Sequence, residues 1–327
     1  MLLVGTLFWG LSFPVTRMLN LHFGEADGAQ PLESFAHAGA TMTLRFAIAA
    51  LVLVLWLRQR LSTLTRSELV QGSGLGLFAG LGLLLQIDGL SYVDASTSAF
   101  LTQAYCLILP VVEAIRDRRW PPAISTTSCV LVLLGVAILA DVDWANFRMG
   151  RGEIETLLSS IFFAAQVLWL DRPCFKRNRA NHFSVIMFAT IALLGLPATW
   201  YWSEVPIQLM ASYFRPKPFA LLALLIVACT LVSFLLMNQW QHHVAASHAG
   251  MIYALEPVSA SLLALWMPGL FSAWLSIHYP NESLTPRLLI GGALILLANV
   301  LMSQRLALEA RLTSSSPPAS DPDTRAP

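Results

Sequence analysis

The sequence predicts an all-α integral membrane protein, with ten transmembrane helices in two inverted five-helix repeats. Three observations predict this class. Of the 327 residues, 56% are hydrophobic and only 12% are charged, which leaves too little polar surface to coat a soluble protein. Apolar stretches of about 20 residues, each able to cross a hydrocarbon core roughly 30 Å thick, recur along the chain. The first five stretches also share a pattern with the last five.

The spans follow one another with short connections, none of which reaches about 25 residues, so no extramembrane domain can fold between them. An apolar stretch at 268–281 is interrupted by Pro268, Gly269 and Pro280, and we expect it to lie along the membrane interface rather than to cross. The ten predicted spans cover approximately residues 2–20, 38–57, 70–88, 95–114, 122–140, 154–171, 183–202, 218–238, 246–267 and 286–304.

A repeat divides the chain into residues 1–140 and 141–305, followed by a disordered cytoplasmic tail at 306–327. In span four, Ala95-Ser96-Thr97-Ser98-Ala99 precedes Pro110, and in span nine, Ala246-Ser247-His248-Ala249-Gly250 precedes Pro257. The span after each carries a central glycine, Gly135 or Gly292. Because five is odd, the second copy enters the membrane from the opposite side, which is the arrangement of many secondary transporters.

Orientation follows from the basic residues, because short cytoplasmic loops are enriched in Lys and Arg. Both termini are therefore predicted to face the cytoplasm. The loops after spans one, three, five, seven and nine carry five basic residues, Arg148, Arg151, Arg215, Lys217 and Arg287. The loops after spans two, four and six carry ten, namely Arg58, Arg60, Arg66, Arg116, Arg118, Arg119, Arg172, Lys176, Arg177 and Arg179.

Several functions are disfavoured by what the sequence lacks. With 20 basic and 19 acidic residues, the net charge of +1 offers no footprint for nucleic acid. The four cysteines, Cys106, Cys129, Cys174 and Cys229, have no CxxC spacing, and there is no HExxH motif, so we expect neither a metal nor an enzyme. No GxxxxGK[ST] motif occurs, and we expect no cofactor; energy would come from an ion gradient or from solute exchange.

Short motifs at ordered positions resemble the EamA-like branch of the drug/metabolite transporter superfamily over nearly the whole chain up to Arg305. That resemblance implies a ten-helix bundle with a central cavity that moves small organic molecules, often outward. The motifs are Trp9-Gly10-x-x-Phe13-Pro14, Leu44-Arg45-Phe46, Gly89-Leu90, Ala95-Ser96-x-x-Ala99-Phe100-Leu101, Leu255-Glu256-Pro257, and Glu282-x-Leu284-Thr285 nine residues ahead of Gly291.

Glu256 is the best-placed polar residue, about ten residues into span nine and hence near the bilayer midplane. A charge there costs about 2.5–3.5 kcal/mol on insertion scales and asks for an explanation. Beside Pro257, which frees a backbone carbonyl one turn earlier, Glu256 could bind a cation or exchange a proton and so couple transport. The alternative is a protonated carboxyl that locks helix packing. We expect helix kinks at three prolines, Pro14, Pro110 and Pro257.

Other polar residues are expected around this acid. Gln103 and Pro110 are seven residues apart and share a helix face, whereas Tyr105 points roughly opposite and should pack against neighbouring helices. Tyr253 lies one turn before Glu256 on the same face. The cavity-lining candidates are Gln103, Tyr253, Glu256, Trp9 and Gln86, with Gln166 as a weaker one. Structural ion pairing is favoured over anion binding for Arg17, Arg45 and Asp88.

These features together predict a secondary transporter, expected to export a small organic metabolite or drug-like compound by alternating access from a bacterial inner membrane. The alternatives are a membrane scaffold or receptor without transport and, less favoured, an intramembrane enzyme. The expected partners are the solute, the lipid bilayer and a proton or cation. Glycines repeat every four residues along span three and favour packing within the chain over a homodimer face; they are Gly72, Gly76 and Gly80.

Overall fold

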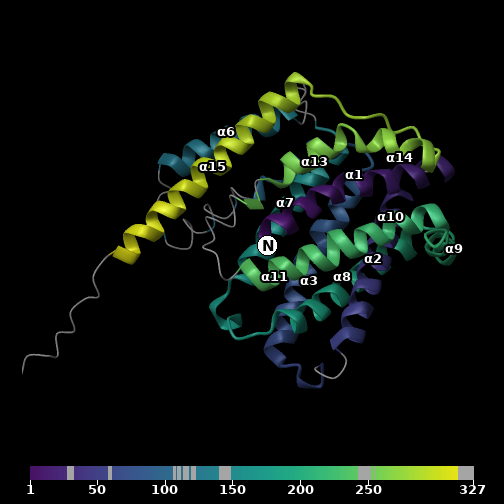
Figure 1. The fold of residues 1–327 in the computed structure, drawn as a ribbon, viewed down its shortest axis with the longest axis horizontal. Coiled ribbons are helices and arrows are strands. Elements are labelled where there is room, and N and C mark those ends of the chain that lie inside the picture. Colours follow the sequence, from purple (N-terminus) through teal and green to yellow (C-terminus); the bar gives the residue numbers. More distant parts are fainter. Residues whose placement is uncertain are drawn as a thin grey trace, which may run out of the picture.

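Every regular element is helical in the part of the chain that the computed structural model describes, and this confirms the all-α prediction there. Figure 1 shows a bundle of helices in which α6 and α15 form a separate pair at one edge. The described part comprises residues 1–27, 33–57, 61–105, 108, 112, 118, 123–139, 149–241, 252, 253 and 255–315.

In the first half of the chain, the described elements are α1 (Leu2–Asp27), α2 (Glu33–Leu57), the short 3-10 turn η1 (Leu61–Thr63), α3 (Arg66–Gly89), α4 (Ala95–Thr102) and α6 (Ala123–Leu139). In the second half, the described elements are α7 (Arg151–Leu170), η2 (Pro173–Phe175), α8 (Ala180–Trp202), α9 (Pro206–Ser212), α10 (Pro216–Ile226), η3 (Val227–Val232), α11 (Ser233–Trp240), α13 (Glu256–Ala264), α14 (Met267–Leu275) and α15 (Pro286–Ser315).

Six helical stretches of the described part are long and apolar enough to cross a membrane, and they match predicted spans one, two, three, six, seven and eight. Predicted spans five and ten coincide with shorter apolar helices, Thr126–Leu139 and Pro286–Leu301. The ten-span topology stays a prediction, because most of span four beyond Tyr105 and the start of span nine lie outside the described residues. The six long stretches are Leu2–Gly24, Glu33–Leu57, Arg66–Gly89, Arg151–Leu170, Ala180–Trp202 and Pro216–Trp240.

The end of predicted span nine differs from the uninterrupted helix that we expected up to residue 267. Helix α13 ends at Ala264 and α14 begins at Met267, with a bend of 54° between them. Pro268 lies in the first turn of α14, where it cannot continue a preceding helix because its ring clashes with the carbonyl four residues back. The chain then returns, since the backbone N–H of Glu282 donates to the carbonyl of Ala264 at 2.9 Å. The interfacial position of 268–281 stays a prediction.

The three prolines expected at kinks have different settings. Pro14 lies inside the continuous helix α1. Pro257 occupies the first turn of α13, where its missing N–H would have had no intrahelical partner anyway. The kink expected there stays a prediction, because residues 246–251 and 254 lie outside the described residues. Pro110 lies outside the described residues.

Glycines bring several helices into backbone contact. A Cβ on Gly39 of α2 would come within 2.7 Å of the Gly195 carbonyl on α8, and one on Gly195 would come within 2.6 Å of the Gly39 carbonyl. Gly135 and Gly291 form the same reciprocal contact between α6 and α15, at 2.8 and 2.9 Å. The glycine that meets Gly135 is therefore Gly291 rather than Gly292, which instead lies against the ring of Phe100.

The glycine stripe of α3 is used for packing within the chain. Added Cβ atoms would collide with α8 at each step, with Ile186 for Gly72, Thr190 for Gly76 and Leu194 for Gly80. Such small-residue stripes allow close helix approach where no hydrophobic force drives association. Because this glycine stripe is covered by α8 of the same chain, it cannot serve as a homodimer interface; the homodimer itself stays a prediction.

The helix of predicted span eight is interrupted by the π-helical turn η3. Two hydroxyl groups reach back five residues within it: Thr230 donates to the carbonyl of Leu225 at 2.9 Å, and Ser233 donates to that of Ala228 at 2.9 Å. Short π-helical turns inside α-helices are frequent at functional sites. This turn faces Arg45 of α2, as the contacts below show.

Candidate functional site

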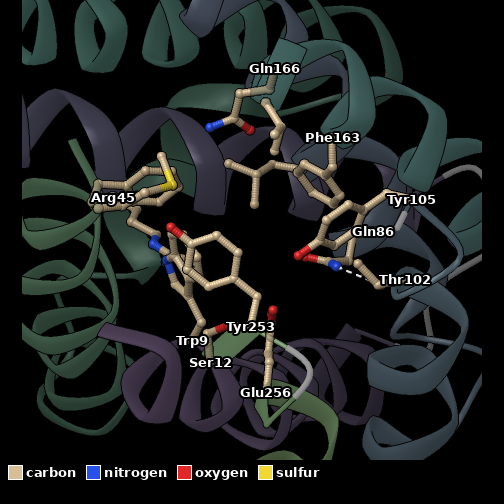
Figure 2. Close-up of a pocket in the computed structure, with 14 residues that line it drawn as sticks. Trp9, Ser12, Arg45, Gln86, Thr102, Tyr105, Phe163, Gln166, Tyr253 and Glu256 are labelled. Atoms are coloured by element: carbon tan, nitrogen blue, oxygen red, sulfur yellow. Dashed lines mark hydrogen bonds between the residues drawn. The ribbon is translucent and has the colours of Figure 1, made fainter. Parts of the chain in front are cut away.

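A cavity lies among helices from both halves of the chain, and it encloses about 70 Å³ in which the centre of a water-sized molecule can move. A site of that volume holds several water molecules, since one needs roughly 10–15 Å³ on this measure. Both aromatic rings and polar groups form its wall (Figure 2). The lining residues are Trp9, Ser12, Arg45, Leu83, Gln86, Thr102, Tyr105, Phe163, Gln166, Val167, Phe234, Met237, Tyr253 and Glu256.

In the first half, the lining comes from α1, α2, α3, α4 and Tyr105 after it. In the second half, it comes from α7, α11, Tyr253 and the start of α13. The edge pair α6 and α15 contributes no lining residue. Four sequence candidates, Trp9, Gln86, Tyr253 and Glu256, are brought together here, and so is Gln166. The cavity is thus a compartment between the halves, with a polar group available on several walls.

Glu256 begins α13 and is buried, with its side chain at the cavity. The amide of Gln103 donates to its carboxyl at 3.4 Å and to the Tyr253 carbonyl at 3.3 Å. The Tyr253 hydroxyl donates to Gln241 at 3.0 Å, which holds the phenol ring against the end of α11. A carboxyl with a neutral amide beside it can accept a proton without losing a charged partner.

Gln103 and Tyr105 exchange the positions that we expected. Gln103 is fully buried behind the cavity wall, and Tyr105 lines the cavity, so the assignment of helix faces is wrong. The reason is local. After Thr102 the N–H groups of Gln103 and Ala104 bond three residues back, to Phe100 and Leu101, at 3.1 Å each. Such a turn advances about 120° per residue instead of 100°, which rotates the side chains that follow.

The last turn of α4 contributes a polar group, Thr102, to the cavity wall. Gln86 of α3 donates to the hydroxyl of Thr102 at 2.9 Å, and Thr102 in turn donates to the Ser98 carbonyl at 2.9 Å. Figure 2 shows this pair on the opposite side of the cavity from Arg45. Thr102 and Ser12 are lining residues that hydropathy gave no reason to single out.

Arg45 of α2 lines the cavity and is only 2% exposed. Its Nε donates to the hydroxyl of Thr230 at 2.5 Å, and its Nη2 donates to the carbonyl of Cys229 at 3.0 Å. Both acceptors belong to the π-helical turn of span eight. The expected ion pair of Arg45 is therefore wrong within the described ranges: its partners there are a hydroxyl and a carbonyl, not a carboxylate.

Asp88 and Arg17 do form ion pairs, as expected. They do not pair with each other, and neither pairs with Arg45. Asp88 is fully buried and pairs with Arg151 at the start of α7, at 2.5 Å, and also accepts a hydrogen bond from Ser34 at 2.6 Å. Arg17 pairs with Asp94 at 2.9 Å. The guanidinium of Arg151 further bonds Glu155 at 2.7 Å, so one basic residue serves two acids.

A second polar cluster lies at the same end of the bundle, around Glu282. Its carboxylate accepts from the backbone N–H groups of Ala95 at 2.8 Å and Ser96 at 3.3 Å, and so caps the start of α4 from a distant part of the chain. Tyr279 donates to Glu282 at 3.2 Å. Burial and then the neighbouring Glu282 carboxylate raise the pKa of the Tyr279 phenol, which keeps it protonated as a donor.

Residues 1–140 match the EamA-like transporter family. An uncharacterized transporter of Archaeoglobus fulgidus is 25% identical over 308 residues, which are 92% of this chain and 83% of the relative. A solved crystal structure covers 95% of this chain and 99% of its own, with a TM-score of 0.55 and 17% identity, and so shares the fold.

The motifs from Trp9 to Leu101, the apolar helices and this family match agree with one another. The named relative is a transporter and extends the likeness over most of the chain. The resemblance seen in the sequence is confirmed over residues 1–140, which match the EamA-like transporter family, and the apolar helices are those of a membrane protein.

Proposed function

We infer that the protein is a secondary transporter that exports a small organic metabolite or drug-like compound by alternating access. The observation that carries this proposal is the cavity, which is lined from both halves of the chain and places a buried arginine and a buried acid among aromatic rings. Substrate sites of secondary transporters typically lie between structural repeats. An ion gradient or solute exchange would supply the energy.

The division into two repeats, residues 1–140 and 141–305, is supported by the helix contacts. Under this division, span one corresponds to span six, and so on to spans five and ten. The contact of α1 with α13 then corresponds to that of α7 with α4, and the contact of α3 with α7 to that of α11 with α1. Three further contacts map onto themselves, namely α2 with α8, α4 with α13 and α6 with α15.

Glu256 is proposed as the coupling residue. It is the one acid that lines the cavity among the described residues, and its hydrogen-bond partner Gln103 is neutral. An acid buried in the membrane without a neutralising cation is costly to maintain, so its presence indicates a functional rather than a structural role. A proton taken up from one side and released to the other would link the solute cycle to the ion gradient.

The proposed location is a bacterial inner membrane with both termini in the cytoplasm, which rests on the bias of basic residues between the loops. In this orientation, the two ionic clusters around Asp88 and Glu282 lie toward the outer face. Together they tie α1, α2, α3, α4 and α7 at that end, and opening outward would require them to separate.

The test compares metabolites in medium and cytoplasm for cells that lack the gene, carry it or overexpress it. We expect at least one small compound to shift from cytoplasm to medium with expression. A cavity-filling variant, Ser12→Trp, should lose the shift, and Leu133→Trp, on an exposed position of α6, should keep it. The proposal fails if no compound moves, or if the two variants behave alike at equal expression.

A further inference from the structure

We propose that Arg45 and Trp9 form a subsite for a carboxylate group, so that the transported solute is a small monocarboxylate. This inference deepens the proposed function: that the carboxylate is transported rests on the proposed function, whereas its binding can be tested separately. It begins from two donors at the cavity that the protein leaves without an anionic partner.

The first donor is Arg45. Other arginines of the described part meet carboxylates: Arg17 pairs with Asp94, Arg151 with Asp88, and Arg179 with Glu68. Arg45 is more deeply buried than these three, and its hydrogen bonds to Thr230 and Cys229 go to neutral oxygens. A buried guanidinium without an anion is costly in a membrane, and arginine is suited to bidentate binding of a carboxylate.

The second donor is the indole nitrogen of Trp9. Trp9 lines the cavity, yet its Nε1 is buried and has no hydrogen-bond partner within the described residues. A buried donor without an acceptor costs about 1–3 kcal/mol. Figure 2 shows Trp9 and Arg45 on the same side of the cavity. The indole ring packs against Tyr253 in a tilted contact at 5.7 Å and against Phe234 in an edge contact at 5.4 Å.

The guanidinium of Arg45 is positioned by hydrogen bonds to span eight. Thr230 and Cys229, which position the guanidinium, belong to the π-helical turn, where hydroxyl groups bond carbonyls five residues back. These contacts use Nε and Nη2 of Arg45. Its remaining nitrogen Nη1 has no protein partner in the described part, and the side chain lines the cavity, so a donor is available to a solute.

The charge of the cavity selects the class of anion. Arg45 is the single cation and Glu256 the single acid among the lining residues. In the protonated state of Glu256, one guanidinium balances a monoanion, whereas a phosphate dianion would leave an unbalanced negative charge in a poorly solvated site. Aromatic side chains cover much of the remaining wall, which suits an apolar or aromatic body on the carboxylate.

The test measures the dissociation constants of three probes of equal ring and similar size, benzoate, benzamide and benzylamine, for the full-length purified protein. We expect benzoate to bind most tightly. Arg45→Gln should weaken benzoate binding by about 10- to 100-fold, as expected for loss of a hydrogen bond to a charged group. Arg17→Gln, at an arginine outside the cavity, should leave it unchanged.

Trp9→Phe keeps the ring and removes a donor that has no protein partner, so it tests the subsite without loss of a native hydrogen bond. We expect benzoate affinity to fall by about 3- to 10-fold and benzylamine affinity to be retained. If Arg45→Gln does not fold, Arg45→Lys replaces it, with an intermediate loss. The subsite would be overturned if the three probes bind with equal affinity or do not bind at all. It would also be overturned if benzylamine binds more tightly than benzoate, or if Trp9→Phe leaves benzoate binding unchanged. None of these outcomes bears on whether expression moves a compound out of cells.

Discussion

Replacement of Glu256 by Gln should abolish gradient-driven accumulation of solute while exchange of solute for solute continues. The glutamine keeps the shape of the side chain, and its carbonyl can still accept from the Gln103 amide, which donates to Glu256 at 3.4 Å. Only the exchangeable proton is lost. For one proton per solute, a pH difference of one unit stores about 1.4 kcal/mol and supports about a tenfold solute gradient.

The measurement uses proteoliposomes with such a pH difference and the solute identified from cells. Wild-type protein should build the gradient, Glu256→Gln should stop at equal concentrations, and Glu153→Gln, outside the cavity lining, should behave as wild type. Accumulation by Glu256→Gln at the wild-type level would show that Glu256 serves packing. Loss of both accumulation and exchange in a folded variant would assign it to binding rather than coupling.

Arg151→Met should lower the free energy of unfolding by about 1–3 kcal/mol, because it leaves the buried Asp88 side chain without the partly exposed guanidinium that pairs with it. Its partner Asp88 has no exposed surface, and the variant leaves this side chain among neutral or acidic neighbours such as Ser34 and Glu155. The double variant Asp88→Asn/Arg151→Met removes both charges and should recover most of the loss, because replacing a whole pair is far less costly than removing one partner.

Unfolding of the purified variants in detergent provides the measurement. Arg172→Met is the matched control, since Arg172 is exposed and stacks on Trp169 at 4.1 Å; its loss should be about 0.5–1 kcal/mol. If the double variant is no more stable than Arg151→Met, or if Arg151→Met costs no more than Arg172→Met, Asp88 is not held by this arginine.

The sequence was informative about spans because bilayer thickness imposes a length on every crossing helix, whatever the residues inside it. Six of the predicted spans appear as long apolar helices for that reason. It also brought Trp9, Tyr253 and Glu256 to one site, because a polar or aromatic residue within a span needs either a partner or a cavity.

The failures concern partners that are distant in the chain or shifts of a fraction of a turn. The acceptors of Arg45 lie 184 and 185 residues away, in a π-helical turn that hydropathy does not reveal. The partner of Asp88, Arg151, is 63 residues away and was counted only as a loop charge. Tyr105 lines the cavity because two hydrogen bonds after Thr102 span three residues instead of four, which rotates the side chains that follow.

The most direct test of alternating access is the reactivity of a single cysteine at position 105, in a background that lacks the four native cysteines. Tyr105 lines the cavity, and Gln103 lies buried behind it. A membrane-impermeant thiol reagent should label Tyr105→Cys when added to either face of the membrane, and should label Gln103→Cys from neither. Labelling of position 105 from one face only, or preferential labelling of position 103, would contradict a cavity that opens to the two sides in turn.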